Sequence, residues 1–179
     1  MYAIISEIDQ QSSETVSQIW HNLCRVCGLE EIYTIPTPHF TWLIADEMDL
    51  GKTKSVLAAM ILQVPRIHTY TFGLGIFSGT LPVFFLPMVK TIDMINLNQK
   101  IWDQIGPHCN QLNTYYSPSF WMPHITLALK DLDKEKLACA VNAYAFEQIK
   151  LSVTMTSIDI AESEDKKIGK ILERFPVQE

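Results

Sequence analysis

The chain has 179 residues, of which 47% are hydrophobic and 19% charged, which predicts one globular domain over residues 1–179 and excludes a disordered chain. A net charge of −6 argues against binding of long nucleic acid through its phosphates. The opening MYAIISEID has no basic segment, and the most apolar window, 81–89, is too short to cross a bilayer. We therefore expect a cytoplasmic monomer with no membrane partner.

The first half of the chain is predicted to alternate strands and helices. Ser12 and Ser13 can cap a helix whose apolar residues recur at helical spacing, and Asp49 can cap another. Pro36 and Pro38 favour an extended entry into the strand between them. In chain order we expect a strand at 2–8, a helix from about 12 to 27, a strand at 38–45, a helix from 49 to about 63, and strands at 68–77 and 80–86 joined at 78–79.

The second half is predicted to follow a similar order. A helix at about 91–106 ends near Gly106 and Pro107, and an aromatic-rich loop follows at 113–122. The remaining expected elements are a strand at 123–130, a helix at about 134–146, and strands at 149–161 and 167–175 with a charged turn at 162–167 between them.

The sequence Pro-His-x-Thr occurs twice, as PHFT within 36–45 and as PHIT within 121–130. Composition alone predicts on the order of 0.02 such matches in a chain of this length. An offset of 85 residues relates His39 to His124, Thr41 to Thr126 and Asp46 to Asp131. We therefore predict an α+β, bilobal fold, in which two pseudo-symmetric lobes of antiparallel sheet with outer helices surround a central cleft.

Strand alternation gives each motif one polar and one apolar face. In each motif the His and Thr share a face, and the opposite face is apolar, formed by Phe40, Trp42, Ile125 and Leu127. Two imidazoles that titrate near neutrality can act as general base and general acid in a displacement at phosphorus. Two Thr hydroxyls can donate hydrogen bonds to the non-bridging oxygens. This chemistry needs no metal and no cofactor.

The two motifs resemble those of the 2H phosphoesterases, the superfamily that includes 2′-5′ RNA ligases and cyclic phosphodiesterases. The resemblance rests on HFT at 39–41 and HIT at 124–126, and extends to FGLGIFSGTLPVFFLP at 72–87 and to MPHITLAL. It implies a catalytic pair, His39 and His124, with Thr41 and Thr126 as phosphate ligands. The implied reactions are opening of a 2′,3′-cyclic phosphate, cleavage of 2′,5′ linkages and reversible RNA end-joining, and the implied partner is a small nucleotide or RNA end.

An alternative is a module of this fold that binds a nucleotide or RNA end without turnover. In either case Tyr115 and Tyr116 are the preferred candidates to stack on a base, whereas for Phe120 and Trp121 packing in the loop is at least as good an interpretation as stacking. Lys130 shares the strand parity of His124 and is a candidate to bind the substrate's charge.

The four cysteines are expected to be buried thiols, as suits a cytoplasmic protein. His21, Cys24 and Cys27 lie on one face of a predicted helix, but near its C-terminus, where the helix dipole disfavours a reactive thiolate. A zinc site shared with His108 and Cys109 remains an alternative.

Overall fold

The computed structural model describes residues 1–164 and 167–178, which form an α+β fold. Its elements largely match the predicted order. They are β1 (Tyr2–Glu7), α1 (Gln10–Cys27), η1 (Glu31–Thr34), β2 (His39–Met48), α2 (Leu50–Ile61), β3 (His68–Tyr70), β4 (Gly75–Phe77), β5 (Val83–Pro87), α3 (Ile92–Ile105), η2 (Gly106–His108), β6 (Cys109–Leu112), η3 (Thr114–Tyr116), β7 (His124–Leu129), α4 (Lys134–Tyr144), β8 (Ser152–Thr154), β9 (Ser157–Glu164) and β10 (Lys167–Pro176).

Side-chain caps set where the helices begin. The carboxylate of Asp9 accepts a hydrogen bond from the Ser12 amide, so α1 starts earlier than predicted, and Ser12 and Ser13 are not its caps. Asp49 caps α2 as predicted. Gly28 ends α1 with a φ of 65°, a conformation that glycine adopts without steric cost.

Two predicted strands are divided, one strand was not predicted, and one ends later than predicted. The expected strand at 68–77 is divided into β3 and β4, because Gly73 has a φ of 72° and turns the chain between them. The expected strand at 149–161 is likewise divided into β8 and β9, and β6 was not predicted. Strand β9 continues to Glu164 and β10 begins at Lys167, so these residues of the predicted charged turn at 162–167 belong to strands, whereas 165–166 lie outside the described residues.

The strand order confirms the internal repeat. The larger sheet has the order β10-β9-β1-β2-β6, the second sheet β4-β5-β7, and β3 pairs with β8. An offset of about 85 residues carries β1 onto β5, α1 onto α3, β2 onto β7, α2 onto α4, β3 onto β8 and β4 onto β9. The order β9-β1-β2 thus corresponds to β4-β5-β7, and the β3–β8 pair joins equivalent strands of the two repeats.

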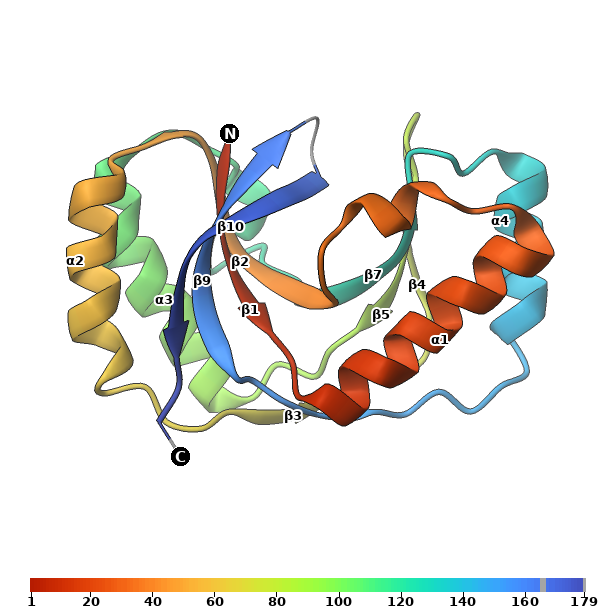
Figure 1. The fold of residues 1–179 in the computed structure, drawn as a ribbon, viewed down its shortest axis with the longest axis horizontal. Coiled ribbons are helices and arrows are strands. Elements are labelled where there is room, and N and C mark those ends of the chain that lie inside the picture. The colour runs from red at the N-terminus through yellow and green to blue at the C-terminus, as the bar shows by residue number, and fades with distance from the viewer. Residues whose placement is uncertain (165–166, 179) are drawn as a thin grey trace.

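Each lobe combines elements of both repeats. Helices α2 and α3 pack together and contact the larger sheet, whereas α1 and α4 pack together and α1 contacts β7. Figure 1 shows these helix pairs on opposite sides of the molecule, with the strands of both sheets between them. Because α1 and β4 of the first repeat lie in the second lobe, and α3 and β9 of the second repeat lie in the first, neither lobe is made by one repeat alone.

The predicted apolar face of each motif lies in the main core. Phe40, Trp42, Ile125 and Leu127 are all fully buried there. A smaller apolar cluster on the other face of the larger sheet contains Ala3, Ile5, Ala161 and Ile168, and this face also carries the first motif.

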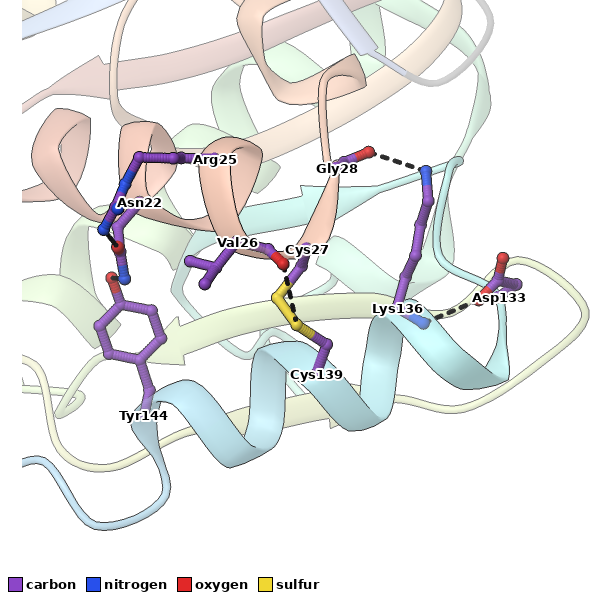
Figure 2. Close-up of a disulfide and its surroundings, with 9 residues drawn as sticks. All are labelled: Asn22, Arg25, Val26, Cys27, Gly28, Asp133, Lys136, Cys139 and Tyr144. Atoms are coloured by element: carbon purple, nitrogen blue, oxygen red, sulfur yellow. Dashed lines mark hydrogen bonds between the residues drawn. A yellow bond between two sulfur atoms is a disulfide. The ribbon is translucent and has the colours of Figure 1, made fainter.

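One cysteine prediction is wrong, because Cys27 forms a disulfide with Cys139 (Figure 2). The bond joins the end of α1 to α4 and spans 112 residues of sequence. Cys24 and Cys109 are half-buried free thiols. Since structural disulfides are rare in cytosolic proteins, the cysteines no longer support the expected cytoplasmic location. No helix among the described residues is long and apolar enough to cross a membrane.

Candidate functional site

The two motif strands meet where the sheets adjoin. Strand β2 contacts β7, and each carries its motif at its N-terminal end. Both strands have a register shift directly after the motif Thr: the extra residue is Trp42 in β2 and Leu127 in β7. A bulge ends the simple alternation of faces, so each motif keeps His and Thr on one face while the next two residues both turn to the core.

Each motif histidine is fixed by the same backbone contact. The Nδ1 atom of His39 lies 2.8 Å from the Thr37 carbonyl oxygen, and Nδ1 of His124 lies 2.8 Å from the Met122 carbonyl oxygen. A carbonyl oxygen can only accept, so Nδ1 carries the proton and donates in both residues. The Nε2 atom of each neutral imidazole is therefore the one available to accept a proton.

The surroundings of the two histidines favour their neutral forms. Burial lowers the pKa of His39 to about 4; a charge on His124 adds to this effect, and the hydrogen bond to Thr37 opposes it. Burial also lowers the pKa of His124, against the effect of its bond to Met122. The electrostatic coupling means that the two imidazoles resist carrying a proton at the same time.

Two phenylalanines hold the His124 ring. The centroids of the Phe77 and Phe85 rings each lie 4.9 Å from that of His124, and the two phenylalanine rings stack at 4.1 Å. Gly75 leaves room for this arrangement, because a Cβ atom there would lie 2.3 Å from the Phe85 ring. Phe77 and Phe85 lie in the segment 72–87 that resembles the superfamily, but the sequence alone did not indicate them as site residues.

Both motif threonines have hydroxyl groups available to a ligand. Within the described residues neither the Thr41 nor the Thr126 hydroxyl has a hydrogen-bond partner. Their carbonyl groups are bonded instead: Trp121 Nε1 donates to the Thr41 oxygen at 2.8 Å, and Trp20 Nε1 donates to the Thr126 oxygen at 3.0 Å. The side chains are thus attached to a fixed backbone.

The aromatic loop before the second motif divides into buried and exposed residues. Of the two residues for which packing and stacking were both open, Trp121 is 1% exposed and packs in the core, whereas Phe120 is 71% exposed. Tyr115 is 78% exposed. Tyr116 packs against the core, and burial raises its pKa to about 12. Among the two predicted stacking residues, only Tyr115 presents a free ring.

The parity argument for Lys130 does not hold. The bulge at Leu127 lies between His124 and Lys130, so equal spacing no longer implies a shared face. Lys130 lies just beyond β7 and has a φ of 66°.

The two aspartates related by the 85-residue offset differ in their surroundings. Asp131 accepts hydrogen bonds from the Glu30 and Glu31 amides, whereas Asp46 is exposed in β2.

A charged group missed by the sequence analysis lies beside the first motif. Glu7 is directly opposite His39 in the sheet and forms an ion pair with Arg174. The Nε atom of Arg174 lies 3.7 Å from Asp159, which also accepts a 2.9 Å hydrogen bond from Ser157. Burial raises the pKa of Asp159 to about 6, and the charge of Glu7 adds to this rise. Only strand pairing across β10, β9, β1 and β2 brings these residues together.

The described residues contain no group of three or more His, Cys, Asp and Glu side chains suited to a metal ion. The alternative zinc site does not assemble, because Cys27 is bonded to Cys139, and Nδ1 of His21 lies 3.1 Å from the Tyr33 hydroxyl. Two surface cavities of about 400 and 360 Å³ lie beside α4, both lined in part by Tyr144, and no motif residue lines either one. The expected central cleft therefore stays a prediction.

Comparison with known proteins identifies the fold. No protein-family model matches the sequence, and no match was found among curated proteins. Among solved structures, the chain is similar to the crystal structure of TT0787 of Thermus thermophilus, with a TM-score of 0.66 and 14% sequence identity. The similarity covers 98% of this chain and 97% of that one. At this identity the comparison shows a shared fold over nearly the whole length of both chains.

Proposed function

We propose that the protein is a metal-independent 2H-type phosphodiesterase that acts on 2′,3′-cyclic phosphates or 2′,5′-linked nucleotide and RNA ends, with reversible 2′-5′ RNA ligation as an extension of the same chemistry. The observation that carries the proposal is the matched histidine pair. Both imidazoles donate Nδ1–H to the carbonyl two residues earlier, and the charge of His124 lowers the pKa of His39. A coupled pair that resists double protonation is suited to hold one neutral and one charged imidazole.

In the proposed reaction the neutral histidine takes a proton from water through Nε2 as the water oxygen bonds to phosphorus. The bond from phosphorus to the 3′ oxygen breaks, and the charged histidine gives its Nε2 proton to that oxygen. The products are a 2′-phosphate and a 3′-hydroxyl. The Thr41 and Thr126 hydroxyls donate to the non-bridging oxygens, whose charge changes in the transition state. Reversal exchanges the roles of His39 and His124.

For substrate binding we assign Tyr115, whose exposed ring can stack on a base. Tyr116 packs on the core, and the bulge at Leu127 means that Lys130 is not expected on the same strand face as His124. Neither residue is therefore part of this assignment. A net charge of −6 is consistent with a small nucleotide or RNA end as the partner rather than long nucleic acid.

The test is turnover of 2′,3′-cyclic nucleotides and 2′,5′-linked dinucleotides by the purified protein in EDTA, with products identified by ³¹P NMR. We expect formation of a 2′-phosphate that is lost in His39→Ala and His124→Ala. The matched control is His108→Ala, which removes a histidine outside the motifs. Binding without turnover across the whole panel would instead support the non-catalytic binding module. Activity that requires an added divalent ion would contradict the proposed mechanism.

A further inference from the structure

The backbone at the two motif threonines lies at sheet edges. Strand β6 pairs with β2 only from Ala45 onward, and β7 is the outer strand of its sheet. No further strand covers these edges at Thr41 and Thr126 within the described residues. Carbonyl groups at such an edge need donors from elsewhere, and here the donors are the indole N–H groups of Trp121 and Trp20.

The two indoles make equivalent bonds from non-equivalent positions. Trp121 precedes the second motif but bonds to Thr41 of the first, and Trp20 lies on α1 of the first repeat but bonds to Thr126 of the second. Each motif is therefore held by a tryptophan from the other repeat. Both bonds end at the residue directly before a bulge. At a bulge the hydrogen bonds between paired strands are interrupted, so they constrain the backbone less there.

Both donors are themselves buried and packed. Trp20 and Trp121 are 5% and 1% exposed. Trp121 stacks on Trp42, with ring centroids 4.8 Å apart and 22° between the planes, and its own carbonyl accepts a 2.7 Å hydrogen bond from Lys90. A rigid donor fixes the orientation of the group to which it bonds.

From these contacts we propose that Trp20 and Trp121 are positioning residues for the two motifs, and this rests on the proposed function. Each indole N–H fixes the peptide plane that follows the motif Thr, and so the direction of that threonine's hydroxyl. Without the bond, the carbonyl turns toward another donor and the hydroxyl moves away from the phosphate oxygen. A tryptophan needed only for packing would require its ring but not its N–H.

The experiment compares Trp121→Phe and Trp20→Phe with one control. Trp102→Phe changes a half-buried indole on α3 that bonds to no motif carbonyl. Assays run well below the melting temperature, per folded molecule, should show kcat reduced about 10-fold in the first two variants with KM little changed. The limbs of the pH profile should not move, because no titrating group is altered. The control should retain kcat within about twofold of wild type.

If a Phe variant does not fold, replacement of the same tryptophan by β-(3-benzothienyl)alanine keeps the ring size and removes only the N–H. Wild-type kcat in both benzothienylalanine variants would overturn the proposal. A readout independent of activity separates this failure from failure of the proposed function. By NMR, the replacement at Trp121 should shift the imidazole resonances of His39, and that at Trp20 those of His124. Unchanged resonances in both variants would overturn the positioning role, even in a protein with no turnover.

Discussion

Removal of the Cys27–Cys139 disulfide should cost a large part of the stability of the fold. The bond closes a loop of 112 residues, and loop-closure entropy for that length corresponds to about 5 kcal/mol at 25 °C. Other contacts between the same segments remain in its absence: Asn22 donates to Tyr144 at 3.0 Å, and Lys136 donates to the Gly28 carbonyl at 2.7 Å (Figure 2). We therefore expect Cys27→Ser with Cys139→Ser to lower the free energy of unfolding by about 2–5 kcal/mol, or Tm by about 4–20 °C.

The assay is guanidinium unfolding of the oxidised protein, the reduced protein and the double variant. Reduction should destabilise the wild type by the same amount as the double substitution and should not affect the double variant. Cys24→Ser and Cys109→Ser are the matched controls, since both thiols are free. Alkylation of the unfolded, oxidised wild type should modify these two cysteines and, after reduction, all four. Equal stability of the three forms, within about 0.5 kcal/mol, would refute the role of the bond.

Three further predictions concern protons. His39→Ala and His124→Ala should each lower kcat by about 10² to 10⁴. The loss of kcat in the double variant should be far smaller than the product of the two single losses, because the two residues act in one step. Losses that multiply in steady-state kinetics would show that the residues act independently. Because burial lowers both imidazole pKa values, kcat/KM should peak below pH 6.5, and kcat at a higher pH because bound phosphate favours the charged imidazole; a kcat/KM maximum above about pH 7.5 would contradict this. The pKa of Asp159 is raised to about 6 in the folded state, so its contribution to stability is present below about pH 4 and lost as the pH rises through about 6. Asp159→Asn should therefore raise the free energy of unfolding at pH 7.5 by about 1–3 kcal/mol and leave it unchanged at pH 4, measured by denaturant titration.

Much of the repeat could be predicted because its signals are local. Proline before each motif, alternation within it and helical spacing on either side define the strands and helices at an offset of 85 residues. The burial of Phe40 and Trp42, together with the hydroxyl and imidazole on the opposite face, follows from strand alternation alone. The strand predicted at 68–77 is wrong because the alternating sequence pattern continues through the turn at Gly73. That turn is visible only in the backbone conformation.

The remainder depends on tertiary contacts that periodicity does not encode. The bulge at Leu127 is invisible in the sequence, and it removed the argument for Lys130. The proximity of Arg174, Glu7 and Asp159 could be predicted only with knowledge of the order in which β10, β9, β1 and β2 pair. The Cys27–Cys139 bond and the indole bonds could be predicted only with knowledge of which helix packs on which sheet. The repeat pattern suggests that a helix packs on strands of its own repeat, whereas α1 packs on β7 of the other repeat.

The position of β1 between β2 and β9 has a consequence for how the polypeptide acquires its structure as it leaves the ribosome. Strand β1 can pair with β2 early, but its other neighbour, β9, is synthesised only after α4 and β8. Similarly, helix α1 packs against β7 and α4, which are both synthesised after it. An emerging N-terminal half therefore carries an unpaired strand edge and an uncovered helix face, which are features that favour association with other chains. Completion of the larger sheet is consequently delayed until β9 is available, and long-range pairing of this kind is slow.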